Sequence, residues 1–138
     1  MTGTADENDD ESDSAIPLPT PWKTFLEEAT QRFRAAGFEN PENEARRIVE
    51  TASGYDAGSL SSGLTQLATE RGVHHFDEMM RRRLEKEPLQ YVCGAWGFRT
   101  LDLMVDHRVL IPRPETEVVA GVAIAELGKQ ENDEKKLV

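Results

Sequence analysis

The fold is decided by residues 87–117, which read EPLQYVCGAWGFRTLDLMVDHRVLIPRPETE. From Trp96 to Val105, apolar side chains alternate with other residues, the two-residue period of strands with one buried face. The pair Arg99-Thr100 falls where two such strands would turn. A further apolar run at 109–111 stops at Pro-Arg-Pro. The pattern therefore predicts a β-hairpin and an extended linker over residues 89–113.

Before this stretch, residues 18–88 carry the pattern of a small all-α domain. Thr20-Pro21 and Asn40-Pro41 each place a capping residue before a proline, which suits the first position of a helix. Apolar residues then recur three and four positions apart, as on one face of a helix. They are Trp22, Phe25, Leu26, Ala29, Phe33 and Ala36, then Ala45, Ile48, Val49 and Ala52, then Leu60, Leu64 and Leu67, and finally Val73, Phe76, Met80 and Leu84. A helical domain of this size can fold alone, with marginal stability.

After the hairpin, Pro114 stands where another helix would begin. The apolar face that follows predicts a helix as far as Gly128, with a charged surface loop at 129–136. We expect Leu137-Val138 to be the start of a buried strand. So apolar a helix needs a sheet to pack on, and the sequence from 114 to 138 is expected to be the start of a larger, truncated domain.

Composition narrows the class of protein. The formal net charge is −10, and residues 1–15 hold six acidic and no basic residues. We expect residues 1–17 to be a disordered acidic tail. The charge argues against direct nucleic-acid binding, and no apolar run reaches the ~20 residues that span a bilayer. The single cysteine allows no intrachain disulfide. The chain is therefore expected to be cytoplasmic, free of membrane and monomeric.

Residues 87–117 resemble the domain junction of the release-factor glutamine methyltransferases, the HemK/PrmC family. That family's pattern is E-P-x-x-Y-hydrophobic-x-G, then F-x-x-L-x-L-x-V, then V-L-I-P-R-P-[DE]-T-E. This sequence matches all three segments of the pattern without a gap inside any of them. The matching residues are Glu87, Pro88, Tyr91, Gly94, Phe98, Leu101, Leu103, Val105 and the run from Val109 to Glu117. The resemblance covers about residues 20–138, with its specific motifs confined to 87–117.

The resemblance implies a mainly α fold, in which a helical bundle and a hairpin linker precede a Rossmann-like methyltransferase domain. It implies an enzyme that uses S-adenosylmethionine to methylate the Gly-Gly-Gln glutamine of a peptide chain release factor, in translation termination. Neither the family's Gly-rich loop nor its Asn-Pro-Pro-Tyr motif occurs in this sequence. We therefore expect this fragment to recognise the release factor without catalytic residues, without a cofactor of its own and without methyl transfer.

Two residues are candidates for contact with the cofactor of a complete enzyme. In enzymes that the chain resembles, the segment before the I-P-R-P turn folds over the cofactor pocket. Carried over by position, Leu110 would pack on S-adenosylmethionine and Arg113 would make a polar contact near it. An equally weighted alternative is that Arg113 only anchors the linker to the second domain.

Other chemistry-bearing residues have simpler explanations. His74-His75 cannot both face one metal from a helix, because adjacent positions point about 100° apart, so no metal site is expected. Glu115 and Glu117 suit the first turn of a helix better than a catalytic pair. Arg81–Arg83 suit a solvated helix end, with a release factor or ribosomal RNA as the less favoured partner. Tyr91, Phe98, Leu101 and Leu103 are expected to be packing residues of the hairpin.

Two other functions stay open. One is a related methyltransferase that acts on a glutamine of a ribosomal protein; that relative tends to read Pro-Arg-Ser-Pro at the turn, so the sequence at 112–117 favours the release-factor class. The other is a non-catalytic module that binds a translation factor. The apolar helix that leads into Leu137-Val138 argues against a finished module.

Overall fold

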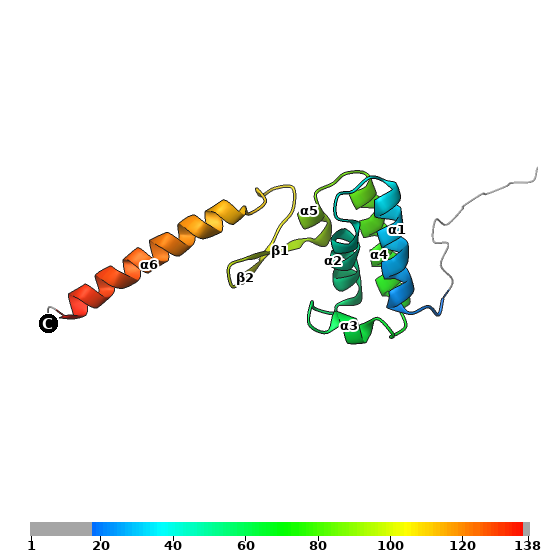
Figure 1. The fold of residues 1–138 in the computed structure, drawn as a ribbon, viewed down its shortest axis with the longest axis horizontal. Coiled ribbons are helices and arrows are strands. Elements are labelled where there is room, and N and C mark those ends of the chain that lie inside the picture. Colours follow the sequence, from blue (N-terminus) through cyan, green and yellow to red (C-terminus); the bar gives the residue numbers. More distant parts are fainter. Residues whose placement is uncertain (1–17, 137–138) are drawn as a thin grey trace, which may run out of the picture. The chain divides into compact units, whose positions relative to one another are not determined.

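A computed structural model describes residues 18–136 (Figure 1). The expected acidic tail at 1–17 and the expected strand start at 137–138 lie outside the described residues. The chain divides after Leu84 into two compact units, one helical and the other containing the hairpin. The described structure is mainly helical with one antiparallel hairpin and a C-terminal helix, which confirms the predicted fold class. The finer domain boundaries at 88 and 113 stay predictions.

The helical unit contains α1 (Trp22–Ala35), α2 (Pro41–Ser53), α3 (Leu60–Gly63) and α4 (Glu70–Leu84). Helix α2 packs against both α1 and α4, and the three lie side by side in Figure 1. Most residues of the predicted apolar faces are buried or half-buried, because one side chain in every three or four points inward. The prediction is wrong for Ala36 and Leu67, which are exposed. The core residues with no exposed surface are Phe25, Ala29, Phe33, Ala45, Ile48, Val49, Met79 and Met80.

The start of the first helix differs from the prediction. Helix α1 begins at Trp22, so Pro21 rather than Thr20 holds the capping position, without a side-chain hydrogen bond. The preceding backbone is extended and pairs with the segment before α4. The Trp22 amide donates to the Gln66 carbonyl at 3.0 Å and the Lys23 amide donates to the Leu64 carbonyl at 2.9 Å. These long-range backbone bonds satisfy the groups that a Thr20 cap would have served.

A charged pair joins α2 to the end of α4. Arg83 donates from Nε and Nη2 to the two carboxylate oxygens of Glu44 at 2.8 and 2.9 Å. Each side chain is only 16% exposed, and the Arg83 guanidinium lies 4.6 Å from the centre of the Phe38 ring. The prediction of a solvated helix end is therefore wrong for Arg83. Its partner comes from another helix, which residue spacing along α4 cannot show.

The second unit contains α5 (Leu89–Cys93), β1 (Ala95–Phe98), β2 (Leu101–Met104) and α6 (Pro114–Lys136). The strands pair antiparallel with Trp96 opposite Leu103 and Phe98 opposite Leu101. Alternate side chains point to one face of a strand, so these four residues share a face, as the sequence predicted. The two-residue turn also lies at Arg99-Thr100, as predicted.

Two segments of this unit are helical where extended or loop structure was expected. Residues 89–93 form one helical turn, because the Pro88 carbonyl accepts the amides of Tyr91 and Val92 at 3.0 Å and Gly94 ends the turn in a left-handed conformation, with φ +74°. Residues 129–136 continue α6 past Gly128. A glycine within a helix costs only about 1 kcal/mol, and ion pairs such as Lys135–Glu131 support the helix at i,i+4 spacing.

Candidate functional site

An apolar groove of about 300 Å³ lies within the second unit, between the hairpin and the linker. It contains both residues that the resemblance assigns to the cofactor wall, Leu110 and Arg113. Leu110 is 80% exposed. The full lining is Phe98, Leu103, Leu110, Ile111, Pro112, Arg113 and Thr116. The contact of Leu110 and Arg113 with a cofactor stays a prediction.

The linker that supplies this lining is tied back to α5. The Tyr91 hydroxyl donates to the Val109 carbonyl at 2.6 Å, one residue before Leu110. The Val105 amide donates to the Gly94 carbonyl at 3.0 Å, which closes the hairpin against the end of α5. Tyr91 was predicted to be a packing residue, but its hydroxyl also fixes the linker. Eighteen residues separate this donor from its acceptor, so no local pattern reveals the bond.

A turn at residues 106–108 follows the second strand of the hairpin. Asp106 Oδ1 accepts the Arg108 amide at 2.9 Å, and the Arg108 guanidinium binds the same carboxylate. The hydrogen bonds from the guanidinium and the amide hold the pKa of Asp106 well below its usual range. Both side chains are substantially exposed, so the pair orders the turn more than it stabilises the fold. This carboxylate therefore stays ionised and is unsuited to act as an acid.

Hydrogen bonds from Arg99 to Glu117, here called the clasp, join the hairpin turn to the first turn of α6. The Glu117 carboxylate accepts the Arg99 amide at 3.1 Å, and the Arg99 guanidinium donates to the Glu117 carbonyl at 3.3 Å. Arg99 has φ +55°, a left-handed conformation uncommon for a non-glycine residue. At Gly121, one helical turn further on, a Cβ atom would lie 2.7 Å from Arg99 Nη1. The absence of a side chain at Gly121 therefore makes room for the clasp.

Arg113 has a backbone role as well as its place in the groove. Its carbonyl accepts the amides of Thr116 and Glu117 at 3.0 and 3.3 Å, the first hydrogen bonds of α6. The two roles that the sequence left open for Arg113, a polar contact near the cofactor and an anchor for the linker, both stay predictions. Glu115 and Glu117 lie in the first turn of α6, as predicted, and Glu117 has the additional contact with the hairpin.

We expect Glu117→Ala to loosen the hairpin turn, because the Arg99 amide loses its charged acceptor. A hydrogen bond to a charged group contributes about 1.5 kcal/mol, so the Arg99 amide should exchange with solvent roughly tenfold faster. Amide hydrogen exchange followed by NMR measures this rate. Glu115→Ala is the matched control, because it removes the same charge from the same helical turn without touching the hairpin. Equal acceleration in both variants would contradict the clasp.

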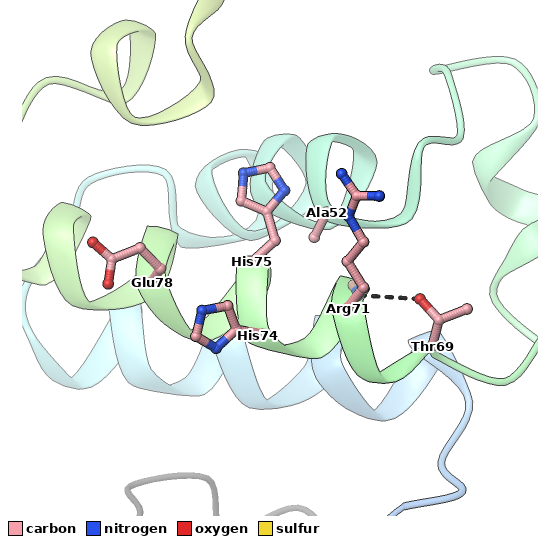
Figure 2. Close-up of a pocket in the computed structure, with 7 residues that line it drawn as sticks. Ala52, Thr69, Arg71, His74, His75 and Glu78 are labelled. Carbon is pink, nitrogen blue, oxygen red and sulfur yellow. Dashed lines mark hydrogen bonds between the residues drawn. The ribbon is translucent and has the colours of Figure 1, made fainter.

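A second hollow, of about 430 Å³, lies on the helical unit between α4 and the end of α2 (Figure 2). Arg71, His74, His75 and Glu78 line it from α4, and Ala52 lines it from α2. The two imidazoles point in different directions in Figure 2, as adjacent helical positions require. Across residues 18–136, no group of three or more His, Cys, Asp or Glu side chains is placed to hold a metal ion.

Comparison with known proteins places this architecture in a family. The family described as the PrmC N-terminal domain matches residues 24–94, slightly more than half of the chain. A release factor glutamine methyltransferase of Bifidobacterium longum is 37% identical over 108 residues, which cover 76% of this chain and 37% of that protein. A release factor glutamine methyltransferase of Streptomyces coelicolor is 37% identical over 97 residues, which cover 70% of this chain and 33% of that protein. A bifunctional methyltransferase of Rickettsia typhi is 31% identical over 102 residues, 74% of this chain and 20% of that protein.

The chain belongs to the PrmC N-terminal domain family. The resemblance drawn from residues 87–117 is thus confirmed at the level of the family. The chain spans about a third of the length of the two release factor glutamine methyltransferases and a fifth of the bifunctional one. Within the described part of the chain, even the 23-residue α6 lacks the apolar length to cross a membrane.

Proposed function

We propose that this chain supplies the recognition domain and linker of an S-adenosylmethionine-dependent methyltransferase acting on the glutamine of peptide chain release factors. The match of residues 24–94 to the PrmC N-terminal domain carries the proposal. The 108-residue similarity to the Bifidobacterium longum enzyme is longer than this domain, so it includes residues outside 24–94. The turn at 112–117, which reads Pro-Arg-Pro-Glu-Thr-Glu, favours a release factor over a ribosomal protein as the substrate.

We propose further that recognition and chemistry are divided. An amide nitrogen is a weak nucleophile, because its lone pair is delocalised into the carbonyl. Methyl transfer to it requires alignment with the methyl donor and hydrogen bonds that favour the developing charge. The sequence of this chain holds neither the Gly-rich loop nor the Asn-Pro-Pro-Tyr motif that aligns and stabilises the reacting groups in the family. The chain by itself therefore binds the substrate protein without methylating it, and it binds no S-adenosylmethionine of its own.

In a complete enzyme the groove would form one wall of the cofactor site. Its apolar lining suits the adenine ring of S-adenosylmethionine, and the Arg113 guanidinium suits its carboxylate. The cofactor supplies the methyl group when bound. Leu110 and Arg113 would orient the cofactor and exclude water from one side of it, and neither would act on the transferred group.

A competition assay tests the division. A complete enzyme, such as the Streptomyces coelicolor relative, methylates a release factor with radiolabelled S-adenosylmethionine. Added chain should sequester the release factor and lower the initial rate more than twofold, and extra release factor should restore it. The chain without the complete enzyme should transfer no label. A ribosomal protein glutamine substrate in place of the release factor should be methylated by its own enzyme at an unchanged rate.

Three results would overturn the proposal. An unchanged rate with ~100 µM chain, roughly the weak end of specific binding, would remove the recognition role. Label transferred by the chain alone would remove the division between recognition and chemistry. Inhibition of the ribosomal-protein reaction in place of the release-factor reaction would assign the chain to the other substrate class.

A further inference from the structure

Three side chains of α4 that can carry a positive charge line the hollow on the helical unit. Arg71 is followed by His74 three positions later and by His75 four positions later, the spacing at which helical side chains are neighbours. All three are exposed. The Thr69 hydroxyl accepts the Gly72 amide at 3.0 Å (dashed line in Figure 2) and fixes the start of the helix beside Arg71.

Arg71 differs from most of the other guanidinium groups of the described helical unit. Those groups meet carboxylates of the same chain, in the pairs Arg34–Glu42, Arg46–Glu50, Arg47–Glu50, Arg81–Glu78 and Arg83–Glu44. Over residues 18–136 the structure shows no hydrogen bond or ion pair for the side chain of Arg71, His74 or His75. Arg71 thus offers an unused guanidinium to the hollow, in a chain that holds 26 acidic residues.

The one carboxylate in the hollow is already engaged. Glu78 accepts from Arg81 Nη2 at 2.7 Å. The Arg81 hydrogen bond, with smaller contributions from the charges of Arg82 and His74, lowers the pKa of Glu78. Glu78 therefore stays ionised and bound to Arg81.

We propose that this hollow binds a carboxylate from an acidic segment of a partner protein. The flat guanidinium of Arg71 matches the two oxygens of a carboxylate. The imidazole of His75 lies one helical turn further along, on the same side of α4 in Figure 2, and can donate a hydrogen bond beside it. A carboxylate fits better than a phosphate, because each carboxylate group carries a single negative charge and the ionised Glu78 in the same hollow repels it less than a phosphate with nearly two. The proposal rests on the contacts in the hollow and holds whichever protein is the methylation substrate.

An NMR titration of the full chain tests the proposal. An acetylated and amidated tetraglutamate peptide is the probe, and inorganic phosphate is added in a parallel series. We expect saturable shifts of the His74 and His75 ring signals with the peptide, and at least fivefold weaker binding after Arg71→Gln. Arg34→Gln is the matched control, since it removes the same charge from the same unit outside the hollow, and it should leave the affinity within twofold.

Each of three outcomes would overturn the proposal. No saturable shift up to ~20 mM peptide, well above the millimolar range of weak contacts, would show that the hollow binds no carboxylate. An equal loss of affinity in Arg34→Gln and Arg71→Gln would assign the shifts to the net charge of the unit. Phosphate bound as tightly as the peptide would exclude the selectivity for carboxylate. A matching amide spectrum for each variant confirms that it is folded.

Discussion

Phe25→Ala is expected to unfold the helical unit. Phe25 has no exposed surface, and its ring lies 5.2 Å from the ring of Phe76 on α4 and 5.5 Å from that of Trp22. Removal of a buried phenylalanine costs about 3–5 kcal/mol, from lost burial and from the cavity left behind. A unit of this size is stable by roughly 5 kcal/mol, so most of the stability should be lost.

Urea unfolding followed by far-ultraviolet circular dichroism measures this loss. The unfolding midpoint should fall to near zero urea, or the cooperative transition should disappear. Leu67→Ala is the control, because the Leu67 side chain is 57% exposed and surface changes of this kind shift stability by about 0.5 kcal/mol or less. Similar midpoints for the two variants would show that the aromatic cluster does not hold the unit together.

Glu44→Gln is expected to cost about 3 kcal/mol. The substitution removes the carboxylate that both Arg83 Nε and Nη2 bind, at a side chain that is only 16% exposed, and loss of one member of a buried charge pair is strongly destabilising. The contact of Arg83 with the Phe38 ring compensates only in part, because a cation–π contact contributes about 1 kcal/mol. The same urea titration gives the free energy of unfolding.

Glu42→Gln makes the comparison specific. Glu42 and Glu44 both lie in the first turn of α2, so both changes remove the same favourable charge from the helix start. Glu42 pairs with Arg34, and both side chains are more than 60% exposed. Its loss should cost less than about 1 kcal/mol. Equal costs would contradict a special role for the buried pair.

The sequence predicted the helical core well, because burial there follows local spacing. Trp22, Phe25, Ala29 and Phe33 recur at helical intervals, and all four are buried in α1. The hairpin could be predicted equally well, since the alternation of its apolar residues and its turn both lie within ten residues. Where local rules competed, prediction failed. Pro88 precedes the single helical turn of α5 and not an extended segment, and α6 continues through Gly128, where the sequence predicts its end.

The candidate site could be predicted only in part. Leu110 and Arg113 came from the family resemblance, and both line the groove. The contacts that shape the groove join residues far apart in sequence: Tyr91 with Val109, and Arg99 with Glu117. Each depends on the hairpin bringing two segments together, so residue types and spacing cannot show it. The partner of Arg83 was missed for the same reason, since Glu44 lies 39 residues away.

Isothermal titration calorimetry of this chain against a bacterial peptide chain release factor tests the central claim most directly. The recognition role predicts a saturable 1:1 interaction with a Kd below ~100 µM, equivalent to a binding free energy of roughly −5.5 kcal/mol or stronger. The Phe25→Ala variant should give no binding heat, because its recognition unit is unfolded. No measurable binding by the intact chain, with its helical unit shown to be folded by circular dichroism, would contradict the claim.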